Sequence, residues 1–187
     1  MGVQMAFTWP KGLSQEDEML LATGALITSA ASLEFFFYVV LECLTEREGQ
    51  RHCEAIWLSH RSTRSRIDMV LAAARLNHLE PGLLAKIEEC AGHMKGISKL
   101  RNYYGHARFV RQEGSAMYEG FVLASEQETR AGADPVRTTI KVINSETIKE
   151  LKDAVDRAER LYEQMLQTAH RLRAHTGAVH VELPALT

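Results

Sequence analysis

The stretch from Met19 to Leu44 contains only two charged residues, Glu34 and Glu42, and constrains the fold more than any other part of the chain. As a helix it would be apolar on nearly every side and long enough to cross a bilayer. A glutamate in the middle of such a span is costly in lipid, and neither flank carries the Lys/Arg excess that sets a membrane orientation. We therefore expect no membrane insertion, and we place this helix inside a helical bundle or at a dimer interface.

The composition is that of an ordinary globular protein that can bury a core. The chain has 187 residues, of which 45% are hydrophobic and 25% are charged, and its formal net charge is −2. These values exclude wholesale disorder and also a basic coat that would hold nucleic acid non-specifically, so any contact with phosphates has to come from a local cluster. We expect one domain over residues 1–176, followed by a mobile tail at 177–187.

Cysteine usage and the first residues bear on location and on metal chemistry. Cys43, Cys53 and Cys90 are an odd number of thiols without a Cys-x-x-Cys pair, which favours a reducing compartment. The N-terminal residues lack the basic and apolar regions of a signal peptide. Glycine-rich phosphate loops and the HExxH and GxSxG motifs are absent as well. We therefore expect a cytoplasmic protein with no metal site and no cofactor.

Apolar residues at helical spacing organise most of the first half of the chain. They predict a long helix over residues 15–46 and a short helical piece around 53–58. A second long helix is expected to begin at a Ser62 cap and to end by the Glu80-Pro81-Gly82 segment. A third is expected from Leu83 to about Ala107.

The second half of the chain combines a strand pattern with the clearest helix. Residues 116–124 and 136–143 favour strands, which predicts a β-hairpin over about 116–143. The last helix begins after Asn144 or Ser145, and its apolar residues follow heptad steps: Ile148, Leu151, Val155, Ala158, Tyr162, Met165, Ala169 and Leu172. The expected fold is mainly α, a four-helix up-and-down bundle with an inserted β-hairpin before the last helix.

Groups that could carry chemistry crowd the end of the third long helix. A fixed cation, an amide, two tyrosines and an imidazole occur within six residues, and two more arginines follow: Arg101, Asn102, Tyr103, Tyr104, His106, Arg108 and Arg111. Arg101 can hold a phosphate through two parallel hydrogen bonds. His106 can accept and donate protons near neutral pH.

The spacing of these residues decides which of them share a helix face. In a regular helix, Arg101 and His106 point roughly 140° apart, because each residue turns the helix by about 100°. They diverge unless the helix distorts at Gly105 or a second subunit completes the site. Asn102 and His106 are four residues apart and share a face, so the amide can hold one imidazole tautomer.

The Arg101–His106 segment resembles the signature of the HEPN domains (higher eukaryotes and prokaryotes nucleotide-binding). In that family an Arg is followed by a polar residue and, four to six residues after the Arg, by a His; Arg101, Asn102 and His106 match this pattern. The first helix, with its Ser32-Leu33-Glu34-Phe35 segment, is also similar to bacterial HEPN-like proteins. The resemblance covers residues 18–111 well and the remainder more loosely, and it implies an α-helical bundle.

The resemblance implies a function. Many HEPN proteins are metal-independent ribonucleases that act as toxins or defence effectors, and their homodimers line one cleft with the Arg and His of both subunits. Here His106 would act as general base on a ribose 2′-hydroxyl or as acid on the leaving 5′-oxygen, Arg101 would stabilise the transition state, and Asn102 would orient the substrate or His106. The products would carry 2′,3′-cyclic phosphate and 5′-hydroxyl ends. The further candidates for contact with RNA are Glu34, Tyr104, Arg108 and Arg111.

The resemblance also bears on partners. Toxins of this kind are often paired with a nucleotidyltransferase-like antitoxin that modifies a tyrosine two residues after the His. This chain has Arg108 at that position. The departure argues against an antitoxin of that mechanism and leaves open a different cognate antitoxin or partner protein.

Structural readings of the same residues stay open. Arg101 and His106 can pair with Glu34 and cap the helix end, where cations are favourable. In that case the chain is a non-catalytic HEPN-like dimerisation or protein-interaction module, or it binds a nucleotide without cleaving it. The basic run Arg61, Arg64 and Arg66 is either a solvated helix start or an RNA-facing patch. Whether the chain is an enzyme is therefore not decided by its sequence.

Overall fold

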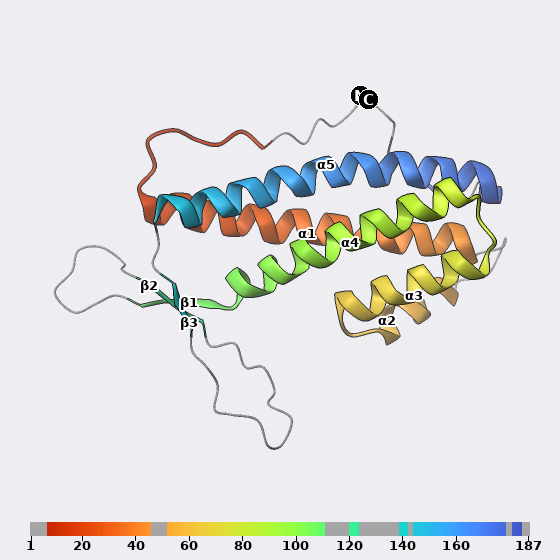
Figure 1. Ribbon diagram of the computed structural model, residues 1–187, viewed down its shortest axis with the longest axis horizontal. Coiled ribbons are helices and arrows are strands. Elements are labelled where there is room, and N and C mark those ends of the chain that lie inside the picture. The colour runs from red at the N-terminus through yellow and green to blue at the C-terminus, as the bar shows by residue number, and fades with distance from the viewer. Residues whose placement is uncertain are drawn as a thin grey trace, which may run out of the picture.

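The computed structural model describes residues 7–45, 52–110, 120–123, 139–141, 144–178 and 181–184. Over these residues the chain forms five helices and three short strands (Figure 1). In chain order they are α1 Gln15–Thr45, α2 His52–Ser59, α3 Thr63–Leu76, α4 Pro81–Gly105, β1 Ala107–Val110, β2 Gly120–Leu123, β3 Thr139–Lys141 and α5 Ser145–Thr176. The prediction of a mainly α-helical protein is confirmed.

The long helices pack as a bundle in which α1 and α5 lie side by side and run in the same direction (Figure 1). Lys152 Nζ lies 3.3 Å from Glu18 Oε1 near the start of both helices. Helix α4 runs antiparallel to both of them. Helix α3 is in turn antiparallel to α4, and Arg75 of α3 pairs with Glu88 of α4 at 2.7 Å. Helices α1, α3 and α5 run in one direction, and the short α2 folds back along α1. The predicted up-and-down order, in which successive helices run in opposite directions, therefore holds only when α2 is counted as one of the helices.

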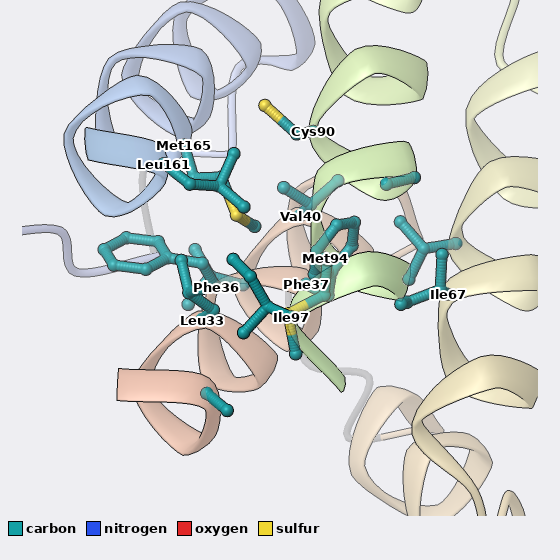
Figure 2. Close-up of a cluster of buried hydrophobic side chains, with 14 of the residues drawn as sticks. Leu33, Phe36, Phe37, Val40, Ile67, Cys90, Met94, Ile97, Leu161 and Met165 are labelled. Carbon is teal, nitrogen blue, oxygen red and sulfur yellow. The ribbon is translucent and has the colours of Figure 1, made fainter. Parts of the chain in front are cut away.

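Helix α1 forms the centre of the core and contacts each of the other helices. Figure 2 shows side chains of α1, α3, α4 and α5 meeting around Phe36 and Phe37, which are 0% and 1% exposed. This placement explains why the helix is apolar on nearly every side. Among the described residues α1 is long and apolar enough to cross a membrane by length and composition, with 44% of its most apolar window buried. A central bundle helix satisfies the same test.

Capping residues set the helix ends largely where the sequence predicts them. Ser62 is the N-cap of α3 and accepts a hydrogen bond from the Ser65 amide at 3.1 Å. Asn144 is the N-cap of α5 and accepts from the Thr147 amide at 2.9 Å. Gly177 ends α5 with a φ of 71°, a conformation in which glycine carries no Cβ penalty. The predicted apolar stripe of α5 is buried apart from Tyr162, which is partly buried.

Three short strands follow α4 and form an antiparallel sheet in the order β1-β2-β3. Strand β1 is a difference from the prediction, because α4 ends at Gly105 and the chain is extended from Ala107. Strands β2 and β3 fall inside the two predicted strand segments and pair antiparallel. Residues 124–138, which join them, lie outside the described residues, so the inserted hairpin stays a prediction.

The residues after α5 pack against the bundle where the structure describes them, and the expected mobile tail stays a prediction. Ala178 and Val181 are each only 4% exposed against the core. The Pro184 carbonyl oxygen lies 2.7 Å from His170 Nε2. Apolar residues in this segment are thus used to cover the bundle. Residues 179–180 and 185–187 lie outside the described residues.

Candidate functional site

The C-terminal end of α4 presents His106 to solvent. The helix ends at Gly105, and His106 is the C-cap residue, with φ −103° and ψ 3°. Its backbone N–H donates to the Asn102 carbonyl at 3.3 Å. The side chains of Asn102 and His106 are both exposed. The imidazole is therefore open to a ligand, as general acid–base catalysis requires.

Arg101 points from α4 toward α1 and α3. Its Nη2 donates to Thr63 Oγ1 at 3.1 Å and lies 3.9 Å from Glu34 Oε2. The side chain remains 30% exposed, so the guanidinium keeps one side open to water. Pairing with Glu34 was one of the open readings of Arg101 and His106, and the structure shows this contact for Arg101.

Glu34 is the centre of this arrangement. Its Oε2 accepts from Thr63 Oγ1 at 2.9 Å, and its Oε1 accepts from Arg66 Nη1. We call Glu34, Thr63, Arg66 and Arg101 the Glu34 cluster. Two guanidinium groups share one carboxylate that is 16% exposed, so the cluster carries a net positive charge. A surplus cation at a partly buried site attracts an anion more strongly than a solvated one does.

Thr63 and Arg66 are the members of the cluster that sequence reasoning did not select as site residues, and Arg66 was considered there only as part of a basic run. Its Nε donates to the His60 carbonyl at 2.9 Å, and its guanidinium lies 5.0 Å from the centre of the Trp57 ring. These contacts hold it in place. Arg61 and Arg64, from the same basic run, are exposed. The available signal was the isolated acid in the first helix, which needs a cationic partner in the core.

The two tyrosines of the motif are held by packing and hydrogen bonding. Tyr104 is 3% exposed, and its hydroxyl donates to the Glu150 carboxylate on α5. Its ring packs edge-on against Tyr103 at 4.9 Å between centroids. Tyr104, predicted as a substrate contact, is therefore placed to join α4 to α5, and its buried ring has no open face for a base.

The structure brings only part of the predicted set together. Among the described residues Arg101 joins Glu34, whereas no direct contact links Arg101 with His106. Arg108 lies in β1, where its Cα pairs with that of Val122, and Arg111 lies outside the described residues. Arg101 and Gly105 follow one face of α4 onto α1: a Cβ built on Gly105 would lie 3.7 Å from Ile27 Cδ1.

Because comparison with known proteins found no match, the function has to be inferred from the fold and from the geometry of this site. No protein-family model, curated protein or solved structure matches the chain. Within the part of the chain that the structure describes, His, Cys, Asp and Glu side chains form no group of three that could hold a metal ion. The site is thus defined by its own chemistry: an arginine–carboxylate cluster between α1, α3 and α4, and a solvent-exposed histidine at the end of α4.

Proposed function

We propose that the chain is a metal-independent endoribonuclease of the HEPN type that acts as a homodimer, with Arg101 and His106 in a shared cleft. The observation that carries the proposal is the cationic Glu34 cluster, whose Arg101 stands five residues, about 1.4 helical turns, before the exposed His106. A fixed guanidinium and an open imidazole are the two groups that cleavage next to a ribose 2′-hydroxyl needs.

The proposed reaction follows from these two groups. An imidazole takes the proton of the 2′-hydroxyl, the 2′-oxygen bonds to phosphorus, and the bond from phosphorus to the 5′-oxygen breaks. The leaving 5′-oxygen takes a proton from an imidazolium, which leaves a 2′,3′-cyclic phosphate and a 5′-hydroxyl. Arg101 stabilises the charge that builds on the phosphoryl oxygens. Base and acid act on opposite sides of the phosphorus, so two imidazoles, one from each subunit, suit the reaction.

The exposed face of α1 supports the homodimer. Leu20, Ile27 and Phe35 are 48%, 42% and 59% exposed, and their spacing of seven and eight residues aligns them on one side of the helix. Ile27 also lies beside Gly105 at the end of α4. A second copy seated on this face about a two-fold axis would bring the two His106 residues toward each other.

The cytoplasmic location, the toxin or defence role, the cognate partner protein and the inserted hairpin belong to the same proposal. A hairpin over about 116–143 would join β2 to β3, the strands that follow α4 and β1 in the chain. The end of α4 is where substrate would enter. Loops at such a position are where proteins of one fold vary their specificity.

A non-catalytic interaction module is the second candidate, and one contact favours it. Arg101 is already engaged by Thr63 and lies near Glu34, which is what a purely structural arginine requires. On this reading the RN…H segment joins α1, α3 and α4, and α1 receives a partner.

Cleavage of RNA in excess EDTA separates the two candidates. The substrate is a labelled RNA with both single-stranded and paired regions, and the ends of the fragments are identified chemically. We expect cyclic-phosphate ends, with His106→Ala slowing cleavage by about 10²–10⁴-fold, the contribution typical of a general acid or base. His175→Ala, which removes an exposed histidine at the far end of α5, should cleave as the parent does.

The quaternary part of the proposal has its own variant. Ile27→Glu places a charge on the exposed α1 face without entering the core, since the side chain is 42% exposed. Sedimentation should then show a folded monomer, and cleavage should fall with it. Intact RNA with the dimeric, folded parent protein would instead support the interaction module.

A further inference from the structure

A groove between α4 and α5 lies apart from the Glu34 cluster. It has a volume of about 460 Å³, and its floor is apolar, formed by Ile97 and Leu100 of α4 with Leu161 of α5. Leu100 turns toward α5 while its neighbour Arg101 turns toward α3 and α1. The two sites therefore open on different sides of α4. A groove of this size matches a small organic ligand.

Two arginines on one wall have no partner within the described residues. Arg157 and Arg160 of α5 both line the groove and are both exposed, and neither takes part in an ion pair or hydrogen bond there. They are three residues apart and so lie on one side of their helix. Two unpaired guanidinium groups above an apolar floor are suited to a carboxylate or a phosphate, which each can bind through two hydrogen bonds.

The opposite wall is kept low by two glycines in the middle of α4. Gly92 and Gly96 line the groove, and a Cβ built on either would meet no atom within 4 Å. Neither has the positive φ that would require glycine. Glycine inside an exposed helix costs about 1 kcal/mol relative to alanine, so this pair destabilises α4 without any return in packing. What the pair does provide is an open wall facing the arginines.

The remaining rim residues are polar and compatible with an anion. His93 and Gln164 complete the groove, and His93 Nε2 lies 3.8 Å from the Glu89 carboxylate, which also accepts from Lys86 at 2.9 Å. Glu89 is thus already neutralised by a neighbouring cation. The two arginines of the groove are therefore not paired with Glu89 and can contact a ligand.

We propose that this groove binds an organic anion with an apolar body: the body lies on the floor, and a phosphate or carboxylate head contacts Arg157 and Arg160. The inference is independent of ribonuclease activity, because it shares no residue with the Glu34 cluster or with His106. It predicts that an anion without an apolar body binds much more weakly than one that has both parts.

Fluorescence titration with 1-naphthyl phosphate tests the proposal on the full chain. The naphthalene reports its own transfer from water to the groove, and 1-naphthoate, inorganic phosphate and neutral 1-naphthalenemethanol serve as companions. We expect saturable binding of one or both naphthyl anions, and the stronger of the two identifies the head group. Inorganic phosphate and the neutral alcohol should bind at least tenfold more weakly.

Variants assign the binding to the groove. Arg157→Gln combined with Arg160→Gln should weaken naphthyl-anion binding at least tenfold, and Gly96→Leu should do the same by filling the groove. Arg171→Gln removes a cation of the same helix that lies 3.9 Å from Glu80, outside the groove, and should leave binding unchanged. Equal affinity in the parent and the double arginine variant, or no saturable binding to the folded parent by millimolar anion, would overturn the proposal.

Discussion

Replacing Gly92 and Gly96 by alanine should stabilise the protein. Both glycines are exposed in the interior of α4, and a Cβ at either position meets no atom within 4 Å, so the methyl groups cause no clash. Alanine is favoured over glycine in a helix interior by about 1 kcal/mol per residue. The double variant should therefore gain about 2 kcal/mol in the free energy of unfolding. For a domain of this length, that gain corresponds to a rise in Tm of about 4–8 °C.

The assay is urea and thermal unfolding followed by helical circular dichroism, with Gly177→Ala as a matched control. A Cβ on Gly177 also meets no atom within 4 Å, but this residue ends α5 with a φ of +71°. An L side chain is disfavoured there, so the same substitution should cost about 1 kcal/mol. A stability gain in α4 and a stability loss at Gly177, at positions where the added methyl group meets no atom, would identify backbone conformation as the cause. An unchanged or lowered stability of the α4 variant would refute the reasoning.

Three further predictions concern the Glu34 cluster, the cap of α5 and the buried thiols. Glu34→Gln removes the charge that Arg66 binds and should lower the free energy of unfolding by about 2 kcal/mol. Anisotropy with labelled single-stranded RNA should show tighter binding, because the net positive charge of the site increases. Weaker RNA binding would count against the proposed site. Asn144→Ala removes the acceptor for the Thr147 amide and should cost about 1 kcal/mol in urea unfolding. Burial raises the pKa of Cys43 from 9.0 to about 12 and that of Cys90 from 9.0 to about 11, so the contribution of these two thiols to stability should be constant below pH 9 and fall toward pH 11. Faster unfolding at a weakly alkaline pH below 9 than at neutral pH would contradict the assignment of this pH dependence to the two thiols.

The helices could be predicted because their signals are local. Ser62 and Asn144 combine a capping side chain with an apolar period that begins one turn later, and both signals agree. The central position of α1 was predictable for a related reason, since a helix with a nearly continuous apolar surface has to be covered on most sides. The direction of the helices was not predictable, because it depends on α2, a helix of 8 residues with a weak pattern.

Other features depend on contacts between distant segments. Strand β1 was missed because its partner β2 comes later in the chain, so no local pattern over residues 107–110 reports the pairing. The burial of Ala178 and Val181 depends on space left by the bundle, which no local signal in the tail reports. The α4–α5 groove has no local signal in the sequence, since its arginines and the glycines that face them lie on different helices.

The candidate site shows the same division between local and distant information. Arg101 and His106 were found through their spacing on one helix, and Glu34 through its isolation in an apolar one. Their arrangement depends on Arg66, whose guanidinium is closer to the Glu34 carboxylate than that of Arg101. Arg101 lies 3.9 Å from the same carboxylate. A guanidinium that shares a carboxylate with a second, better placed one is the more easily released to a phosphate, because its departure leaves no buried charge unpaired. On the proposed function, Arg66 would let Arg101 be held in the folded protein and still be released to an RNA phosphate.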